Sequence, residues 1–217
     1  MDGSDGMIDD LVRRAADGEE VALAELFDRY RRRLRLMVRL RLDRRLQGRV
    51  DPSDVLQEAY IDLAQKLPEY AGRSTMPFFL WLRLVTGERL LRVHRQHLGA
   101  AMRDAGREIS LCRGALPQAS SVSLAAQLLG RYTSASRAAV RAEMQFLLQE
   151  ALNGMEPIDR EVIALRHFEE LSNDETAAAL DLTKAAASKR YVRAMLRLKA
   201  ALSESPGFSG LVPDGPG

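Results

Sequence analysis

The stretch SNDETAAALDLTKAAASKRYVRAMLRLKAAL, residues 172–202, decides the fold of the C-terminal part of the chain. Ser172-Asn-Asp-Glu175 has the S-x-x-E pattern of a capping box, in which the Ser and Glu side chains satisfy backbone N–H groups at a helix start. It therefore predicts a short helix from Glu175 to Leu180. The turn Asp181-Leu-Thr183 follows, and its Thr can cap a second helix, Lys184 to Leu202. Two helices joined by three residues form a helix-turn-helix.

The second of these helices has an apolar side and a basic side. Three- and four-residue spacing predicts burial of Ala187, Tyr191, Ala194, Met195, Leu198 and Leu202. The opposite side is predicted to hold Ala185, Ala186, Lys189, Arg190, Arg193 and Arg197. Such a helix can enter a major groove, where Arg or Lys bonds guanine edges, small alanines allow close approach, and later residues meet phosphates. DNA binding is favoured over the alternative, a solvated basic helix in a bundle.

Helical periodicity also dominates the N-terminal half. Apolar residues repeat at three and four between Leu23 and Val38, after a short amphipathic stretch from Ile8 to Ala15. Asp51-Pro52 is a typical cap and first residue of a helix. The apolar face of that helix extends to Leu67, and Pro68 is predicted to end it. Another helix is expected from Pro77 toward His97.

The fold predicted is all-α, with two small helical domains and no strands, because aromatic residues are only 6% and β-branched residues do not alternate with polar ones. Serine, glycine and proline interrupt the periodicity in residues 104–142, which we interpret as a flexible linker with one short helix possible at Ser123–Leu129. The domains are then residues 8–103 and 143–202. Residues 1–7 and 203–217 are expected to be a disordered N-terminus and a disordered tail.

Charge is almost balanced overall, with 32 Lys and Arg against 30 Asp and Glu, but it is segregated along the chain. Residues 29–49 hold ten Arg and one acid, and residues 184–199 hold six Lys or Arg and no acid. Residues 143–181 hold ten acids and two Arg. Blocks of this kind predict basic faces for a polyanion and acidic faces for other proteins.

The polar face of the helix that begins at Pro52 carries a stripe of carboxylates. Asp54, Glu58 and Asp62 follow at four-residue intervals, with Gln57 beside them. Like charges at this spacing cost a few tenths of a kcal/mol per pair unless a basic group neutralises them. The spacing alone fits two interpretations: a docking surface for a basic partner, or a solvated face that pairs with the arginines of residues 29–49.

Three motifs in order give the chain a resemblance to a known family. Asp51-x-x-Asp54-Val-Leu-Gln57-Glu58-Ala-Tyr resembles the core-binding helix of bacterial RNA polymerase sigma factors of the extracytoplasmic-function (ECF) group. Phe79-Leu-Trp81-Leu is similar to their promoter-melting segment. Residues 159–172, followed by Glu175-Thr-Ala, match the start of their last domain. The resemblance covers residues 8–103 and 143–202.

The resemblance implies a sigma factor that binds core polymerase and directs promoter recognition, DNA melting and transcription initiation. Residues 8–103 would be sigma domain two, which docks on the clamp helices of the largest polymerase subunit and opens the minus-ten element. Residues 143–202 would be sigma domain four, which reads the minus-thirty-five element, while the linker threads through the RNA exit path. Factors of this group are commonly held inactive by an anti-sigma factor. The alternative function is a stand-alone helix-turn-helix regulator whose N-terminal domain senses a ligand or dimerises.

The site residues that follow fall into three sets. Core binding is assigned to Asp54, Gln57, Glu58 and Asp62. Contact with single-stranded minus-ten DNA is assigned to Arg73, Ser74, Thr75, Arg83, Arg89, Arg92 and Arg95. Minus-thirty-five binding is assigned to Lys184, Ala185, Ala186, Ser188, Lys189, Arg190, Arg193 and Arg197.

Some residues near these sets depart from the family pattern or fit two roles. Glu88 stands where many members have Asn, and Ala187-Ser-Lys-Arg190 replaces their Val-Lys-Ser-Arg. An acid that faces DNA is unfavourable, so promoter preferences do not transfer to this chain. Phe78, Phe79 and Trp81 suit base stacking or the core, and their helical spacing favours the core.

Other chemistries find little support in the sequence. His94 and His97 lie three apart without a zinc ligand spacing, which favours nucleic-acid contact or surface exposure over a metal. The single cysteine, Cys112, has no His-Asp pattern with it. With no P-loop, dinucleotide-binding glycine pattern or G-x-S-x-G, we expect no enzyme activity and no cofactor. One cysteine, no apolar run of about 20 residues and no signal-peptide core predict a cytoplasmic protein without membrane insertion.

Overall fold

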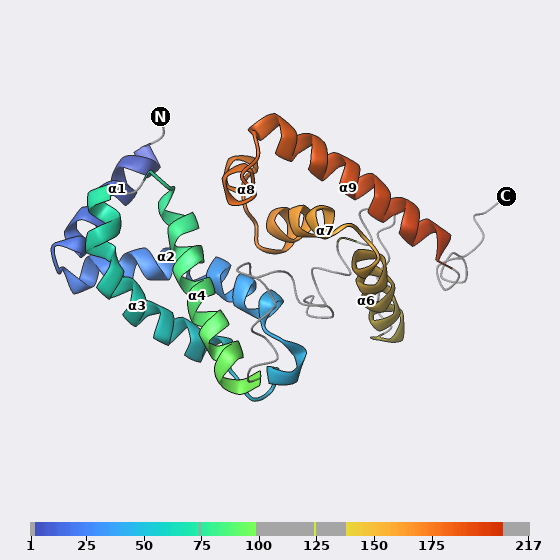
Figure 1. Ribbon diagram of the computed structural model, residues 1–217, viewed down its shortest axis with the longest axis horizontal. Coiled ribbons are helices and arrows are strands. Elements are labelled where there is room, and N and C mark those ends of the chain that lie inside the picture. The colour runs from blue at the N-terminus through green and yellow to red at the C-terminus, as the bar shows by residue number, and fades with distance from the viewer. Residues whose placement is uncertain (1–2, 74, 99–123, 125–137, 206–217) are drawn as a thin grey trace. The chain divides into compact units, whose positions relative to one another are not determined.

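The computed structural model describes residues 3–73, 75–98, 124 and 138–205 (Figure 1). The described helices belong to two compact units, and each unit is considered by itself. Apart from one isolated bridge between Gln47 and Val50, the described residues are helices, turns and loops, so the predicted all-α class is confirmed. None of the described helices is long and apolar enough to cross a membrane.

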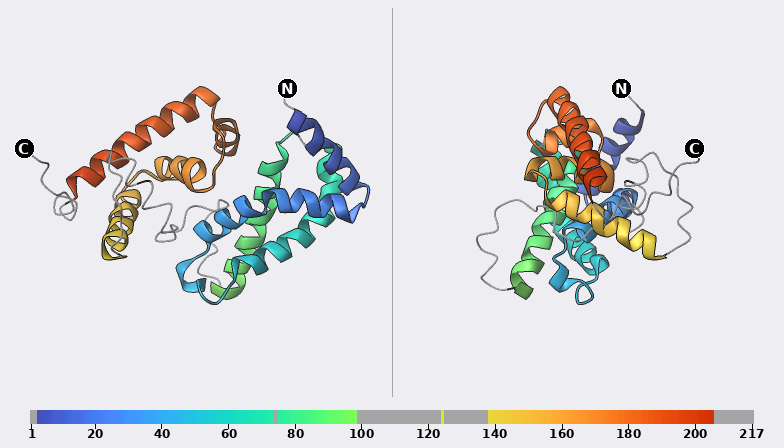
Figure 2. Two further views of the ribbon diagram at one scale, coloured as in Figure 1. Left: turned by 180° about the vertical axis from the view of Figure 1, so that it is seen from behind. Right: turned by 90° about the vertical axis from the view of Figure 1, so that its right-hand side faces the viewer.

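The first unit is built from four long helices and one short 3-10 turn. These are α1 (Gly3–Ala16), α2 (Glu20–Arg41), η1 (Arg44–Leu46), α3 (Pro52–Arg73) and α4 (Phe78–Leu98). Helix α4 packs against both α2 and α3, which can be followed from two sides in Figure 2. Leu26, Leu34 and Leu90 are fully buried between them, which places the core along the apolar stripes read from the sequence.

Aromatic side chains fill the end of this core near the loop before α4. The Phe78 and Phe79 side chains are buried, as the core interpretation predicts, while Trp81 is half-buried. The Trp81 ring stacks on Tyr70 with 4.5 Å between centroids, and the Tyr70 hydroxyl donates a hydrogen bond of 2.7 Å to the carbonyl of Met76. These contacts fasten the end of α3 to the loop that leads into α4.

The second unit contains the predicted helix-turn-helix. Its elements are α6 (Ala138–Asn153), α7 (Pro157–Ile163), a π-helical turn η3 (Ala164–Phe168), α8 (Asn173–Ala179) and α9 (Lys184–Glu204). Helix α9 packs on α6, α7 and α8, and Ala187, Ala194 and Leu198 on its inner side are fully buried. The turn between α8 and α9 includes Asp181 with a φ of +52°, a left-handed value that Asp tolerates better than most residues.

Both caps predicted for the helix-turn-helix are present. The Ser172 hydroxyl accepts a hydrogen bond of 3.1 Å from the Glu175 N–H, and the Glu175 carboxylate accepts one of 2.7 Å from the Ser172 N–H. The Thr183 hydroxyl accepts a bond of 3.1 Å from the Ala186 N–H. Because Ser172 is the cap, α8 begins at Asn173, two residues before the predicted start.

One predicted helix end is wrong. Pro68 does not terminate its helix, because α3 continues to Arg73 with Pro68 inside it. A proline in a helix removes one hydrogen bond, here the bond to the carbonyl of Ala64. Both Pro68 and Ala64 are exposed, so water can satisfy that carbonyl. Two residues after the proline, Tyr70 stacks on Trp81 of α4, so the last turns of α3 are packed against another helix.

Three segments that the sequence assigned to the disordered ends or the linker include helical residues. Helix α1 begins at Gly3, α6 begins at Ala138 and α9 extends to Glu204, so residues 3–7, 138–142 and 203–204 are helical. Once a helix is anchored by packing, each added residue gains a hydrogen bond without a new nucleation cost. Residues 138–142 read AAVRA, in which the three alanines and the arginine are good helix formers. The remainder of the predicted linker, except Leu124, and the tail after Ser205 lie outside the described residues.

His94 is buried, which corrects the expectation of surface exposure or nucleic-acid contact. Its Nε2 accepts a hydrogen bond of 3.2 Å from the backbone N–H of Asp43, whereas His97 is exposed. Burial lowers the pKa of His94 below its ordinary value; the Asp43 carboxylate opposes this shift and the Arg45 guanidinium adds to it. The fold therefore binds the neutral imidazole, because protonation would remove the acceptor of the Asp43 N–H.

This arrangement predicts a pH-dependent stability. A histidine with a lowered pKa in the folded chain stabilises the fold fully above its unfolded pKa of about 6.5, and that contribution declines as the pH falls below it. We expect His94→Gln, which keeps an acceptor but does not titrate, to flatten the dependence of unfolding free energy on pH between about 5 and 8. The same change at the exposed His97 is the control. An unaltered slope in His94→Gln, measured by urea denaturation, would contradict the assignment.

Candidate functional site

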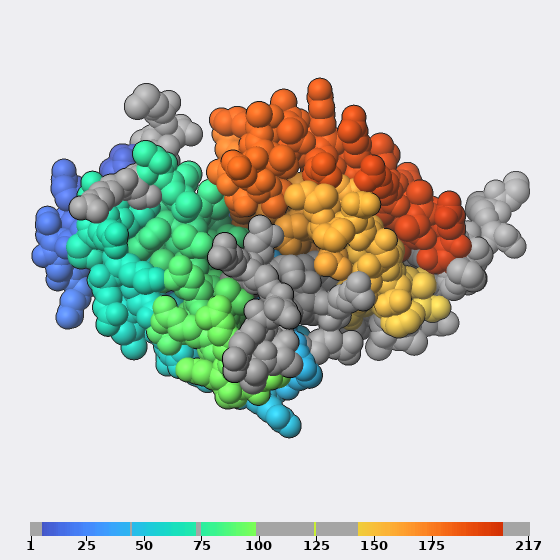
Figure 3. All heavy atoms as spheres, viewed as in Figure 1, coloured from blue at the N-terminus to red at the C-terminus, as the bar shows by residue number. Residues whose placement is uncertain are grey.

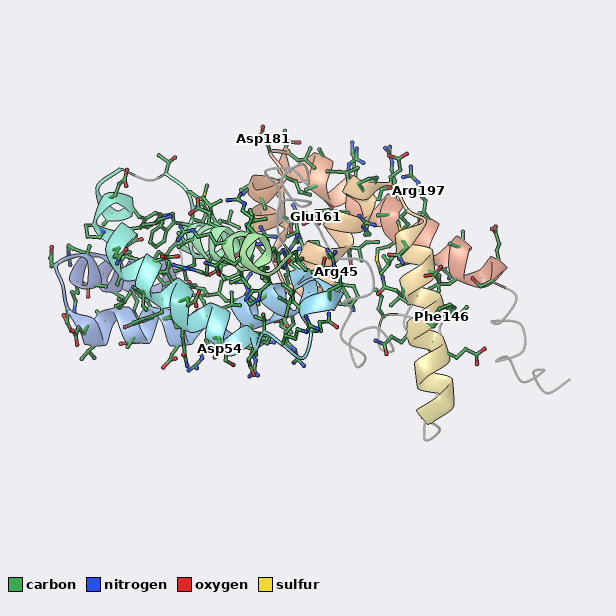
Figure 4. The ribbon with its side chains drawn as sticks, turned by 60° about the horizontal axis from the view of Figure 1, so that its bottom comes forward. Arg45, Asp54, Phe146, Glu161, Asp181 and Arg197 are labelled. Carbon is green, nitrogen blue, oxygen red and sulfur yellow. The ribbon has the colours of Figure 1, made fainter. Side chains whose placement is uncertain are left out.

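The predicted carboxylate stripe on α3 divides into an exposed part and a buried part. Asp54, Gln57 and Glu58 are exposed, and Asp54 lies at the edge of the first unit in Figure 4. Among the described residues, the Asp54 and Gln57 side chains make no ion pair or hydrogen bond. Asp62 is buried. Three of the four predicted core-binding residues therefore share an open surface, and the fourth does not.

Asp62 is buried because arginines of α4 bind its carboxylate. Arg89 Nε donates to Asp62 Oδ2 at 2.8 Å, and Arg92 Nη1 approaches the same oxygen at 3.4 Å. Arg89 Nη1 also reaches Glu58 at 3.3 Å. The hydrogen bond from Arg89, and then the attraction of Arg89, Arg92 and Lys66, lower the pKa of Asp62 despite burial. The neutralising charges thus come from Arg89 and Arg92 of α4 and from Lys66 of α3 itself, not from the arginines of residues 29–49.

The residues predicted to bind the minus-ten element lie at the end of α3, between α3 and α4, and along α4. Thr75 and Arg95 are exposed, and Arg83 is half-buried. Arg89 and Arg92 lie on the side of α4 that faces α3, where they bind Asp62. The Arg73 side chain and Ser74 lie outside the described residues. Arg89 and Arg92 are therefore bound to a carboxylate within the fold, whereas Arg95 lies at the surface.

The exposed side of α9 carries most of the predicted minus-thirty-five residues. Figure 3 shows α8 and α9 at the surface of the second unit. The exposed residues in the predicted set are Lys184, Ala185, Ala186, Ser188, Lys189, Arg193 and Arg197. Lys184 Nζ lies 2.6 Å from the carboxylate of Asp174 on α8, but both side chains are more than half exposed, so the pair is easily broken.

Two predicted DNA contacts occupy a different face from the one expected. Arg190 Nη1 donates to Asp159 Oδ1 at 3.0 Å, and Arg197 Nη1 binds the other oxygen, Asp159 Oδ2. Asp159 belongs to α7 and its side chain is only 2% exposed. The placement of Arg190 and Arg197 opposite the apolar side is therefore wrong: each lies three residues after a fully buried alanine, beside the packed seam. Figure 4 labels Arg197 on α9.

Exposed apolar residues accompany the polar surfaces. Ile61 on α3 is 58% exposed and lies four residues after Gln57, next to the stripe. On α9, Val192 and Leu196 are 54% and 63% exposed. Sequence reasoning missed all three, although Ile61 shares the four-residue spacing that identified the carboxylates. Among the described residues, no three His, Cys, Asp or Glu side chains gather as a metal site.

Comparison with known proteins finds similarity to sigma factors. The family model described as "Sigma-70, region 4" matches residues 145–198. The ECF RNA polymerase sigma factor SigD of Mycobacterium tuberculosis is 27% identical over 192 residues, which are 88% of this chain and 82% of that protein. The RNA polymerase sigma-E factor of Streptomyces coelicolor is 39% identical over 56 residues, or 26% of this chain and 32% of that protein. The chain is therefore similar to an ECF sigma factor over most of its length.

A solved structure shares the fold. The structure of CnrH in complex with the cytosolic domain of CnrY aligns with a TM-score of 0.54 and 22% identity, over 91% of this chain and 98% of that chain. The family match to residues 145–198 extends from α6 into α9 and so includes α8, the turn after it and most of α9.

The acid at position 88 of this chain has a partner. Lys66 Nζ of α3 lies 2.5 Å from the carboxylate of Glu88 on α4, and both side chains are between one third and one half exposed. The lysine offsets the charge that made an acid unfavourable near DNA. The sequence showed the departure from Asn at this position, but the partner lies 22 residues away along the chain.

We predict unequal stability effects for two carboxylates of α3. Asp62→Ala removes the acceptor of Arg89 and leaves a mostly buried guanidinium without its carboxylate, so the free energy of unfolding should fall by about 1–3 kcal/mol. Glu69→Ala, an exposed acid on the same helix, should change it by less than about 0.5 kcal/mol. Urea denaturation of the full chain measures both. Equal losses would show that the Asp62 network does not stabilise the fold.

Proposed function

We propose that this chain acts as an ECF sigma factor and that its two units have different roles in promoter recognition. Residues 8–103 act as sigma domain two, which binds core RNA polymerase and holds the opened minus-ten element. Residues 143–202 act as sigma domain four, which binds the minus-thirty-five element. The polymerase makes the RNA, and this chain supplies promoter recognition in the cytoplasm. CnrH was solved with the cytosolic domain of CnrY, and we include an anti-sigma factor among the partners of this chain.

The exposed stripe on α3 supports the assignment of core binding. Asp54, Gln57 and Glu58 present two carboxylates and an amide, and Ile61 continues the same surface. Negative groups left open to solvent favour a basic partner, and an apolar residue among them adds area that binding would bury. Asp62 supports this surface from beneath, because Arg89 joins it to Glu58. We therefore assign Asp62 the role of positioning Glu58.

The loop before α4 and the basic residues of α4 support the assignment of minus-ten binding. Thr75 is exposed in the loop, directly beside the segment that holds Ser74. Arg83 and Arg95 lie near opposite ends of the helix, so they can contact different phosphates of one strand. Arg89 and Arg92 retain N–H donors beyond those bound to Asp62, because a guanidinium has five. Arg73 completes the set at the end of α3.

The capped helix-turn-helix supports minus-thirty-five binding. The caps at Ser172 and Thr183 fix where α8 and α9 begin, which orients the first turns of α9. Ala185 and Ala186 leave space for a base edge, while Lys189 is exposed one turn further on. Arg193 is exposed beyond it, which supports a role in contacting a phosphate.

This proposal rests above all on one pairing of features within a single chain, an open acidic stripe on α3 and a capped basic helix-turn-helix. Run-off transcription with sigma-free core polymerase and genomic promoter fragments tests it. We expect transcripts that depend on the promoter and vanish without this chain. Failure to associate with core polymerase, together with tight binding of palindromic DNA by the chain alone, would instead establish a stand-alone regulator.

The docking surface predicts the effect of a charge reversal. Asp54→Arg places a positive charge on the exposed stripe without removing a contact within the fold, so core affinity should fall by about tenfold or more. Glu69→Arg makes the same kind of reversal on the same helix outside the stripe and is the matched control. Binding is measured by titrating labelled chain with core polymerase in the absence of DNA. Equal affinities for both variants would exclude the α3 stripe as the docking surface.

A further inference from the structure

The buried carboxylate of Asp159 binds two arginines from different turns of α9. Positions 190 and 197 are seven residues apart, or roughly 10 Å along a helix axis, yet both side chains reach the two oxygens of Asp159. Asp159 stands in the first turn of α7 and is almost inaccessible, while Arg190 and Arg197 are 40% and 59% exposed. The three residues form a triad that bridges α7 and α9.

Burial of the Asp159 carboxylate requires these partners. A charge removed from water is costly unless it is paired and hydrogen-bonded, and here each oxygen has its own arginine. The pairing fixes α9 both at Arg190 and two turns later at Arg197. Rotation of α9 about its axis would separate both pairs, so the triad restrains which side of α9 faces outward.

The surroundings of the two arginines disfavour a DNA phosphate. Arg190 and Arg197 line an open groove of about 830 Å³, and the other charged residues that line it are Glu150 and Glu156. With Asp159 beneath, three acids face two arginines. A phosphate in this groove would be repelled, whereas Lys189 and Arg193 lie outside the groove lining and are exposed.

We propose that Asp159, Arg190 and Arg197 position the DNA-binding helix and that neither arginine contacts DNA. The triad holds α9 on α7 so that Ala185, Ala186, Ser188, Lys189 and Arg193 face the minus-thirty-five element. This inference refines the proposed function and rests on it, because it reassigns two residues of the predicted DNA-binding set to a positioning role.

An apolar replacement of the whole triad separates positioning from DNA contact. Buried ion triads can be replaced by packed apolar side chains without loss of the fold. Asp159→Leu alone leaves two arginines without their carboxylate, so α9 loosens and minus-thirty-five binding weakens. The triple variant Asp159→Leu/Arg190→Met/Arg197→Met restores an α7–α9 contact. Each variant is assembled with core polymerase, and promoter affinity is measured over a range of salt concentrations.

We expect the triple variant to bind the promoter at least about tenfold more tightly than Asp159→Leu, with the salt dependence of the wild type. Arg193→Met, which removes an exposed arginine of the same helix, should reduce the slope of log K against log salt by about 0.9, the value for one phosphate contact. A triple variant that stays as weak as Asp159→Leu, with a slope reduced by about 1.8, would overturn the proposal, because both arginines would then contact phosphates.

Two further measurements distinguish failure of the triad from failure of the proposed function. If wild-type holoenzyme initiates at no promoter, the proposed function fails, and the triad is then judged from the unfolding of the full chain. A double-mutant cycle between Asp159→Asn and Arg190→Met should show coupling in the stability of the second unit, followed by hydrogen exchange of the α9 amides. Absence of coupling would overturn the triad even where Asp159→Leu fails to fold.

Discussion

A carboxylate buried between two arginines recurs in both units, and the rest of each unit depends on it. In the first unit, Asp62 of α3 holds Arg89 and Arg92 of α4. In the second, Asp159 of α7 holds the two arginines of α9. Each carboxylate would be unfavourable alone, and each arginine would be free to rotate alone. Because every partner comes from a different helix, the pairs fix how the helix with the basic surface packs on its neighbour.

These pairs change what the basic residues contribute to binding. From the sequence alone, the lysines and arginines of α4 and α9 would be available to bind a polyanion. In the structure, Arg190 and Arg197 are bound to Asp159, and Lys66 of α3 offsets the negative charge of Glu88 on α4. The positive charge that remains available at the surface is therefore smaller than the composition indicates, and it is confined to fewer residues. A smaller charge lowers non-specific affinity for DNA, while fixed side chains preserve selectivity.

Local chemistry was readable from the sequence, and long-range pairing was not. The capping box at Ser172 and the cap at Thr183 act within three residues, so the helix-turn-helix could be placed nearly to the residue. Pro68 shows the limit of prediction from local sequence. The helix continues past this proline, and the stacking of Tyr70 on Trp81 that accompanies it involves a residue of another helix. Asp159 shows the same limit more strongly. In the sequence it is an ordinary acid in the first turn of a helix, and its two arginine partners lie 31 and 38 residues further along the chain.

The arginines of α4 divide the α3 stripe into two groups. Asp54, Glu58 and Asp62 are equivalent by spacing, since each follows the last by one turn, but they differ in how near they lie to α4. Asp62 faces Arg89 and is buried, Glu58 shares that arginine at the edge, and Asp54 remains in solvent. Neutralisation thus weakens toward the start of the helix, which leaves uncompensated negative charge beside Gln57. A basic partner that docks there meets a carboxylate that has no ion pair within the described part of the chain, and Asp62 keeps α3 fixed on α4 while it does so.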